Sequence, residues 1–228
     1  MSVFLLNDQI VFPSPDLAEE NGLLAVGGDL MPERLIAGYR RGIFPWFSEG
    51  DPLLWWFTSP RLVLFPSEFK IPKRLQRYRK KSTIKITRDN DFAQVIKACA
   101  ETRIQSGEET WIGEEMQQAY IKLHQMGYAH SIECRIDNTL VAGLYGIALD
   151  KVFFGESMFS LTPNGSKFAL IELVSYLKSM QFQLIDCQMT TDLLVSFGAK
   201  EITGKEFQLQ LQSSIKNITP SGNWNNDL

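Results

Sequence analysis

Residues 129–160, AHSIECRIDNTLVAGLYGIALDKVFFGESMFS, determine the fold class of this chain. They contain three apolar runs rich in β-branched and aromatic residues, separated by short polar pairs. The runs are His130–Ile136, Leu140–Ala148 and Val152–Phe159, and the polar pairs are Asp137-Asn138 and Asp150-Lys151. Strand-like runs with such short polar separators are typical of hairpins. The stretch is therefore expected to form a meander of three antiparallel strands.

Helical periodicity occurs on both sides of this meander. The predicted helices are Pro32–Arg41, Lys73–Lys81, Asp91–Thr102, Gly113–Met126, Ser166–Met180 and Asp192–Phe197. Further strands are expected at Thr83–Thr87 and Gln183–Gln188, and Ile202–Leu211 is expected to close the sheet. The tail after Lys216 is polar and is expected to be loose, apart from Trp224. Together these elements indicate an α+β fold with a mixed, mostly antiparallel sheet.

The first quarter of the 228-residue chain differs in composition from the rest. It is rich in glycine, proline and aromatic residues, as in GLLAVGGDL at 22–30 and YRRGIFPWF at 39–47. We expect residues 1–61 to form a small N-terminal domain that has little regular structure and packs through its aromatic side chains. Residues 62–228 then form a second, larger domain.

Composition excludes several classes of protein. The chain is 44% hydrophobic and 21% charged, as in ordinary globular proteins, and no apolar run approaches the roughly 20 residues that span a bilayer. The N-terminus lacks the features of a signal peptide. Three scattered cysteines and two histidines make neither a disulfide framework nor a zinc site. We expect a cytoplasmic protein without a metal or cofactor.

Positive charge is concentrated in one segment. Nine Lys and Arg residues and no Asp or Glu lie between Lys70 and Arg88, whereas the rest of the chain holds 14 basic and 26 acidic residues. Such a block is either the footprint of a polyanion or a solvated basic helix with no ligand. The acidic remainder could suit a cationic partner.

The run FFGESMFS, residues 153–160, is a first candidate for a site. Strand alternation puts Phe154, Glu156 and Met158 on one face, and Gly155 indicates a bulge or a close backbone approach. A carboxylate two residues from a methionine suits a substrate with an ammonium group and an unbranched apolar side chain. The alternative is a core strand in which Glu156 forms a salt bridge at an edge.

A second candidate is the run LIDCQ, residues 184–188. Asp186 and Gln188 share one face of an otherwise apolar strand, and buried polar groups are costly unless they are paired. They therefore hold each other or a ligand, or Asp186 caps the next helix.

Tryptophans form a third candidate. Trp46, Trp55, Trp56 and Trp111 accompany the basic block. Aromatic side chains beside a basic surface can stack on nucleobases. Packing at a domain interface explains each of them equally well.

Several of these motifs occur together, and in order, in one known family. They are NGLLAVGGDL (21–30), RRGIFPWF (40–47), WI (111–112), AHSIE (129–133), LVAGLYG (140–146), FFGESMFS (153–160), SK (166–167), LIDCQ (184–188) and SFGA (196–199). The chain resembles the leucyl/phenylalanyl-tRNA–protein transferases from about Phe12 to Phe207. Phe57, Thr58, Arg135, Ala142 and Leu193 depart from the pattern of that family.

The resemblance implies a fold and an activity. The fold is a small N-terminal domain joined to a GNAT-like acyltransferase domain. The activity is transfer of Leu or Phe, and less readily Met, from aminoacyl-tRNA to the α-amino group of proteins that begin with Arg or Lys, which marks them for degradation. The acetyl-CoA-dependent acetyltransferases share the fold class, but their pyrophosphate loop, Q/R-x-x-G-x-G/A, is absent from the sequence. A non-catalytic RNA-binding module would leave Asp186 and Gln188 without a task.

The resemblance also implies roles for individual residues. Asp186 is expected to act as a base or as electrostatic support, Gln188 to bind the attacking amine, and Glu156 to hold a cationic group. The aminoacyl adenosine is expected to contact Trp46, Trp111, Leu144, Gly155, Met158 and Ile185. The basic helix is expected to bind tRNA phosphates through Lys73, Arg74, Arg77, Arg79, Lys80 and Lys81.

Overall fold

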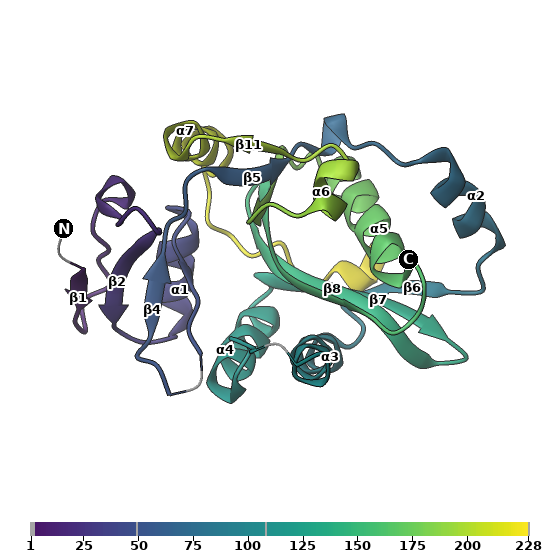
Figure 1. Ribbon diagram of the computed structural model, residues 1–228, viewed down its shortest axis with the longest axis horizontal. Coiled ribbons are helices and arrows are strands. Elements are labelled where there is room, and N and C mark those ends of the chain that lie inside the picture. Colours follow the sequence, from purple (N-terminus) through teal and green to yellow (C-terminus); the bar gives the residue numbers. More distant parts are fainter. Residues whose placement is uncertain (1–2, 49, 108, 228) are drawn as a thin grey trace.

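Two β-sheets organise the chain in the computed structural model, which describes residues 3–48, 50–107 and 109–227. Within these residues one sheet has four strands and the other has seven. They lie side by side along the long axis of the molecule (Figure 1). We refer to them as the small sheet and the large sheet.

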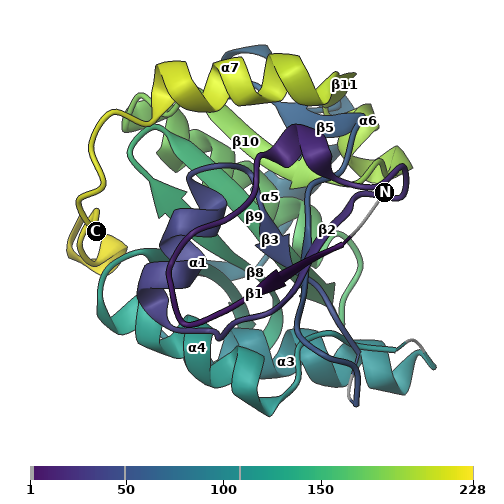
Figure 2. The same ribbon diagram turned by 90° about the vertical axis from the view of Figure 1, so that its left-hand side faces the viewer.

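The small sheet has the order β1-β2-β4-β3, and helix α1 lies beside it (Figure 2). Its elements are β1 Phe4–Leu6, β2 Leu23–Gly27, α1 Pro32–Tyr39, β3 Phe44–Pro45 and β4 Leu54–Trp56. Leu24, Leu35 and Trp55 are fully buried in its core. The expectation of little regular structure was wrong here, because strands of two to five residues are too short for alternation to be read from sequence.

The large sheet has the order β11-β5-β10-β9-β8-β7-β6. Its centre is the predicted meander, formed by β7 Ala129–Ile136, β8 Thr139–Leu149 and β9 Val152–Ser160. The turn residues Asp137, Asn138 and Asp150 all have positive φ. Asn and Asp tolerate this conformation better than most residues, which is why these polar pairs end the strands.

One strand pairing in the described part of the large sheet is parallel. Helix α5, Gly165–Ser179, connects β9 to β10, Leu184–Gln188, and β10 then runs parallel to β9. The remaining pairings are antiparallel. A mixed, mostly antiparallel sheet with a helical crossover confirms the predicted α+β class. Helices α3 and α4 lie on one side of this sheet, and α5 and α6 lie on the other (Figure 1).

The other predicted elements of the large domain agree with the structure to within a few residues. They are α2 Lys73–Lys81, β6 Lys85–Arg88, α3 Phe92–Gln105, α4 Glu114–Gln125 and α6 Asp192–Ser196. The Asp91 side chain caps α3 by accepting a hydrogen bond from the Gln94 amide at 3.2 Å. Short 3-10 helices occur at Pro15–Leu17, Pro66–Glu68 and Trp224–Asp227.

Two segments at the edge of the large sheet differ from prediction. The strand expected over 202–211 is a short strand, β11 Lys200–Ile202, followed by helix α7, Gly204–Ser214. Thr203 and Glu206 form a capping box that begins this helix, and Phe207 and Leu211 are buried one turn apart. A strand that was not predicted, β5 Arg61–Leu64, lies between β11 and β10.

The C-terminal segment is anchored rather than loose. Trp224 is 2% exposed and stacks on the His130 ring at 3.8 Å. Asp89 is buried beneath it and accepts hydrogen bonds from the Trp224 amide at 2.8 Å and from His130 Nδ1 at 2.7 Å. The Ser221 hydroxyl lies 2.8 Å from His130 Nε2. No helix in the described part of the chain is long and apolar enough to cross a membrane.

Candidate active site

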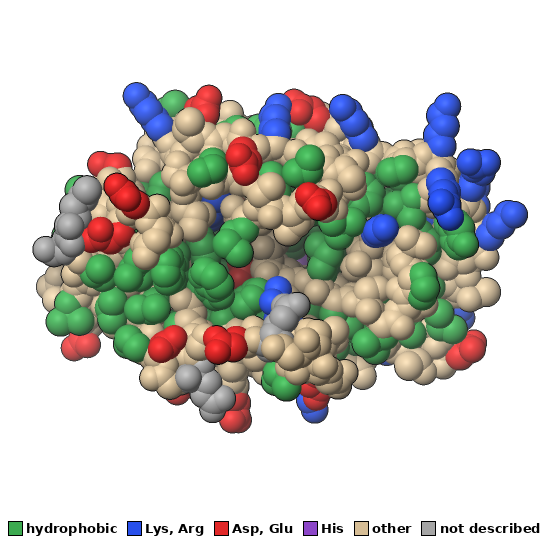
Figure 3. All heavy atoms as spheres, in the orientation of Figure 1, with side chains coloured by type: hydrophobic (Ala, Val, Ile, Leu, Met, Phe, Trp, Pro, Cys, Tyr) green, Lys and Arg blue, Asp and Glu red, His purple; other side chains and the backbone are tan. Residues whose placement is uncertain are grey.

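A cavity of about 330 Å³ opens where β9 and β10 separate. Their pairing ends at Phe154 and Asp186, whereas β9 continues to Ser160 beside β8. The gap exposes the backbone at Gly155, and the face of the molecule in Figure 3 is hollowed near its centre. The residues of the predicted site that line the cavity are Trp111, Leu144, Gly155, Glu156, Met158, Ile185 and Gln188.

A β-bulge places Glu156. Tyr145 pairs with Ser157 and Gly146 with Gly155, so Glu156 is an extra residue in β9. The expectation that Phe154, Glu156 and Met158 share one face was therefore wrong, because the bulge reverses the alternation. Phe154 packs in the core beneath α3 and α4, and Met158 packs on the opposite side of the sheet, which α5 covers.

Buried hydrogen bonds hold the Glu156 carboxylate. Tyr39 donates to Oε1 at 2.8 Å, Tyr120 to Oε2 at 3.1 Å, and Gln188 Nε2 to Oε1 at 3.2 Å. The two tyrosine hydroxyls also contact each other. Burial raises the pKa of Glu156 from its ordinary value near 4.5 to about 7, although the tyrosine donors oppose this rise. The group can therefore change its charge near neutral pH.

Asp186 does not line the cavity but lies behind it in a buried ion pair. Arg61 donates from Nε to Oδ1 at 2.8 Å and from Nη2 to Oδ2 at 2.7 Å, and both side chains are essentially inaccessible. The same guanidinium also donates to Thr58 Oγ1 and to the Gly42 carbonyl, each at 3.1 Å. Both carboxylate oxygens of Asp186 are therefore bound to Arg61, and neither lies in the wall of the cavity.

Gln188 connects this pair to Glu156. The backbone N–H of Gln188 donates to Asp186 Oδ1 at 2.9 Å, and the side-chain Nε2 of Gln188 donates to Glu156. A bulge at Cys187 and a φ of 59° turn the residue away from the strand. Such a conformation is costly for a residue other than glycine, and it persists where surrounding contacts hold it. The expected proximity of Asp186 and Gln188 is thus confirmed, although an irregular backbone produces it.

The tryptophans have different roles. Trp111 lines the cavity, and Arg103 lies over its ring at 4.2 Å. Trp46 packs at right angles to Trp111, with ring centroids 6.3 Å apart, and does not line the cavity. Trp55 is fully buried and donates to the Gly27 carbonyl, so the packing interpretation holds for it.

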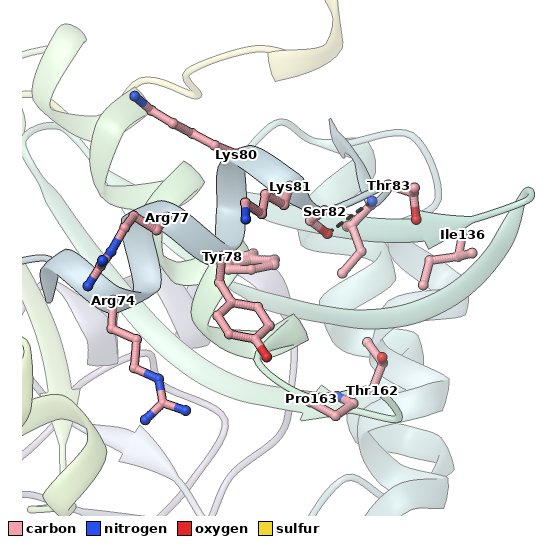
Figure 4. A pocket seen from close by; sticks show the side chains of 12 residues that line it. Arg74, Arg77, Tyr78, Lys80, Lys81, Ser82, Thr83, Ile136, Thr162 and Pro163 are labelled. Atoms are coloured by element: carbon pink, nitrogen blue, oxygen red, sulfur yellow. Dashed lines mark hydrogen bonds between the residues drawn. The ribbon is translucent and has the colours of Figure 1, made fainter.

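The basic helix α2 lies at a different place from the cavity. Arg74, Arg77, Lys80 and Lys81 line an open groove of about 810 Å³ (Figure 4). Figure 3 shows the concentration of Lys and Arg side chains at this end of the molecule. Lys73 is exposed outside the groove. Arg79 forms an ion pair with Glu172 at 2.8 Å.

Several residues near the site were not predicted to belong to it. They are Arg61, Tyr39 and Tyr120 behind the carboxylates, and Tyr145 in the wall of the cavity. The Tyr145 hydroxyl is buried and has no hydrogen-bond partner among the described residues. Burial raises the pKa of Tyr145 well above its ordinary value, so the hydroxyl stays protonated and can donate to a ligand.

Three of the five departures from the family pattern, Phe57, Thr58 and Leu193, lie close to these residues. Thr58 accepts a hydrogen bond from Arg61, and Phe57 packs on Phe207 with ring centroids 6.3 Å apart. Leu193 lines the cavity. Pro60 and Arg61 could be read in the sequence, but nothing in the sequence indicated that Arg61 pairs with Asp186.

Two family models match the chain. The model described as leucyl/phenylalanyl-tRNA protein transferase matches residues 63–212, and the model for the N-terminal domain of that transferase matches residues 28–59. The leucyl/phenylalanyl-tRNA–protein transferase of Desulfotalea psychrophila is 56% identical over 98% of this chain and 99% of its own length. The transferase of the same name from Desulforapulum autotrophicum is 50% identical over 98% of each chain.

Solved structures give a more distant likeness. A predicted acetyltransferase from Clostridium acetobutylicum, solved with acetyl-CoA, has a TM-score of 0.44 and 13% identity over 53% of this chain and 92% of its own. The C-terminal domain of a putative lysylphosphatidylglycerol synthetase from Agrobacterium fabrum has a TM-score of 0.42 and 14% identity over 73% of this chain and 55% of its own.

The Arg61–Asp186 pair predicts a non-additive effect on stability. Arg61→Met leaves a buried, unpaired carboxylate and should lower the free energy of unfolding by about 3–5 kcal/mol. Replacing both partners (Arg61→Met with Asp186→Leu) should recover part of this loss, as measured by urea denaturation. Lys200→Met, which breaks a half-exposed pair with Glu68, is the control and should cost less than about 1 kcal/mol. Additive losses in the double variant would contradict the pairing.

The raised pKa of Glu156 predicts a pH-dependent stability. Between about pH 4.5 and 7 the unfolded chain releases this proton and the folded chain keeps it, so the free energy of unfolding falls as the pH rises. Relative to wild type, Glu156→Gln should therefore gain up to about 3 kcal/mol across this window. Urea denaturation at several pH values measures the difference, with the exposed Glu101→Gln as control. A difference that does not change with pH would refute the assigned ionisation.

Proposed function

Because the chain belongs to the leucyl/phenylalanyl-tRNA–protein transferase family, we propose that it transfers leucyl or phenylalanyl groups, and less readily methionyl groups, from tRNA to proteins that begin with Arg or Lys. The observation that carries this proposal is the Glu156–Gln188 pair beside an apolar cavity. It provides an anionic site for a cationic amine next to a site for an apolar side chain. The modified acceptor would be marked for degradation in the cytoplasm.

The apolar wall of the cavity suits an unbranched side chain. Leu144, Met158 and Ile185 belong to one hydrophobic cluster, which continues into α5 through Leu170 and Leu173. Met is flexible enough to accommodate Leu, Phe or Met in the same space. Branching at Cβ would bring a methyl group against the wall, and one methyl is worth only about 1–3 kcal/mol of discrimination.

Glu156 is suited to bind a cation. Its pKa of about 7 lies close to the working pH, and an ammonium or guanidinium group would favour the ionised form. The hydroxyls of Tyr39 and Tyr120 hold the Glu156 carboxylate in a fixed orientation. The group bound there is the ammonium of the donor or the basic N-terminus of the acceptor.

The attacking amine must be neutral, and its pKa when free is about 8. The side-chain nitrogen of Gln188 donates one hydrogen bond to Glu156, which leaves the side-chain oxygen of Gln188 to accept a hydrogen bond from the amine. Asp186, bound to Arg61, positions Gln188 through the backbone amide. We propose this positioning role for Asp186 instead of the role of a base.

The reaction is the aminolysis of an ester, which is already activated. The new amide bond forms as the ester bond to the ribose breaks, and the proton of the amine ends on the ribose hydroxyl. Holding the two reactants together supplies much of the rate. A negative charge develops on the carbonyl oxygen of the ester as the amine attacks. The backbone N–H groups near Gly155 and the Tyr145 hydroxyl lie at the cavity and can donate hydrogen bonds to this oxygen.

The remaining contacts belong to the tRNA. We propose that Trp111, supported by Trp46, packs against the terminal adenosine, and that Lys73, Arg74, Arg77, Lys80 and Lys81 bind phosphates. Arg79 contributes less because Glu172 already neutralises it.

We also propose that the chain is divided into two domains, residues 1–61 and 62–228. Arg61 lies at this boundary and makes contacts on both sides of it.

A transfer assay tests this function directly. The protein is incubated with leucyl-tRNA and a peptide that begins with Arg, and the peptide is analysed by mass. We expect a gain of one leucyl residue, and no gain with a peptide that begins with Asp, because Glu156 would repel it. Wild-type protein that modifies neither peptide would refute the function, and equal transfer from isoleucyl-tRNA would refute the shape of the pocket.

The two arginines on α2 predict different salt dependences. Arg77→Gln removes a free cation from the groove, so the slope of log K for tRNA binding against log salt should fall by about 1. Arg79→Gln is the matched variant on the same helix and should change the slope less, because its charge is paired with Glu172. Fluorescence titration of tRNA at several salt concentrations measures both slopes. Equal changes would contradict the assignment.

A further inference from the structure

The groove beside α2 combines a basic rim with an apolar floor. Its rim carries Arg74, Arg77, Lys80 and Lys81, and its floor is formed by Ile84, Ile136, Pro163 and Phe168. Phosphate binding alone explains the rim, because lysine and arginine need no apolar surface to contact a phosphate. The floor indicates that an apolar or flat group also enters the groove.

Tyr78 is the aromatic side chain of this groove. It is 55% exposed, and in Figure 4 its ring points from α2 toward the loop that carries Thr162 and Pro163. The helix is anchored by another residue, Leu75, which is buried. Tyr78 is therefore not needed to hold α2 in place, and one turn of helix separates it from Arg74, which points in the same direction (Figure 4).

A second, smaller groove continues this surface toward α6, which also borders the cavity of the candidate active site. It has a volume of about 290 Å³ and shares Arg74 and Tyr78 with the first groove. Its other side includes Ser196 and Phe197, at the end of α6. The same helix lines the catalytic cavity through Leu193 and Leu194. A strand whose 3′ end lies in the cavity can thus pass α6 and reach α2.

We propose that this groove is a nucleotide subsite, in which the base of an unpaired nucleotide upstream of the terminal adenosine stacks on Tyr78. Arg74 and Arg77 bind the phosphates on either side of it. The inference rests on the proposed function, since it requires a nucleic acid whose end lies in the cavity. Base stacking on an aromatic ring accepts any base, so the subsite reads an unpaired strand and not its sequence.

Charge and shape favour a nucleic acid over an anionic membrane as the occupant. Tyr78 is a single ring among six cations of α2, so this helix has no apolar face to insert into lipid. The ring of Tyr78 and the apolar floor of the open groove provide flat and apolar surface on which a base can pack. Repeated phosphates on a single strand match cations spaced along a helix.

The experiment compares two donors in the transfer assay, leucyl-tRNA and the leucyl ester of adenosine, which lacks upstream nucleotides. Tyr78→Ala should lower the ratio of kcat/KM for tRNA to kcat/KM for the ester by about 5- to 100-fold. Tyr78→Phe keeps the ring and should keep the wild-type ratio. Leu209→Ala, which removes an exposed apolar side chain on α7, is the control and should also keep it.

Salt dependence separates stacking from charge. Tyr78→Ala should leave the salt slope of tRNA binding unchanged, whereas Arg74→Gln should lower it by about 1. If Tyr78→Ala keeps the wild-type ratio of kcat/KM for tRNA to kcat/KM for the ester, the inference is overturned. If Tyr78→Ala keeps that ratio but abolishes binding to vesicles of anionic phospholipid, the groove is a lipid site and the inference is likewise overturned. Wild-type protein that transfers from neither donor would instead refute the proposed function.

Discussion

The buried ion pair between Arg61 and Asp186 is the interaction on which the rest of the structure depends. A guanidinium removed from water is tolerated only when its donors are satisfied, and here they bind Asp186, Thr58 and the Gly42 carbonyl. The rings of Phe44 and Phe207 lie against its two sides at 4.8 and 4.7 Å. One side chain thus joins the small sheet, the large sheet and α7.

The ion pair also decides how the chemistry can proceed. Arg61 binds the carboxylate of Asp186, which the sequence favoured as a base. Asp186 in turn fixes the position of Gln188, because it accepts a hydrogen bond from the Gln188 backbone N–H. The second carboxylate, Glu156, is held by tyrosines and has a pKa of about 7. The two carboxylates thus have different surroundings, one in a buried ion pair and the other in the wall of the cavity. An activated ester needs positioning more than it needs a strong base.

Sequence alone predicted most of the long helices and strands of the large sheet, but it missed α7, the short strands and the irregular backbone. The meander was predictable because its strands are long and their turns contain Asp and Asn. Gly155 indicated an irregularity in β9, but the sequence did not show that Glu156 would be the extra residue, and this bulge places Met158 on the other face. Tyr39 and Tyr120 were missed because only the packing of α1 against α4 brings them to Glu156.

The close approach at Gly42 limits how this architecture can change. The residue has a φ of 75°, and a Cβ there would meet the Phe207 ring at 2.5 Å, next to the carbonyl that Arg61 binds. Gly42, Arg61 and Phe207 are therefore in close contact where the small sheet meets the large one, and we call this contact the seam. A larger residue at position 42 would therefore require a smaller side chain at position 207, so the two sides of this seam can change only together.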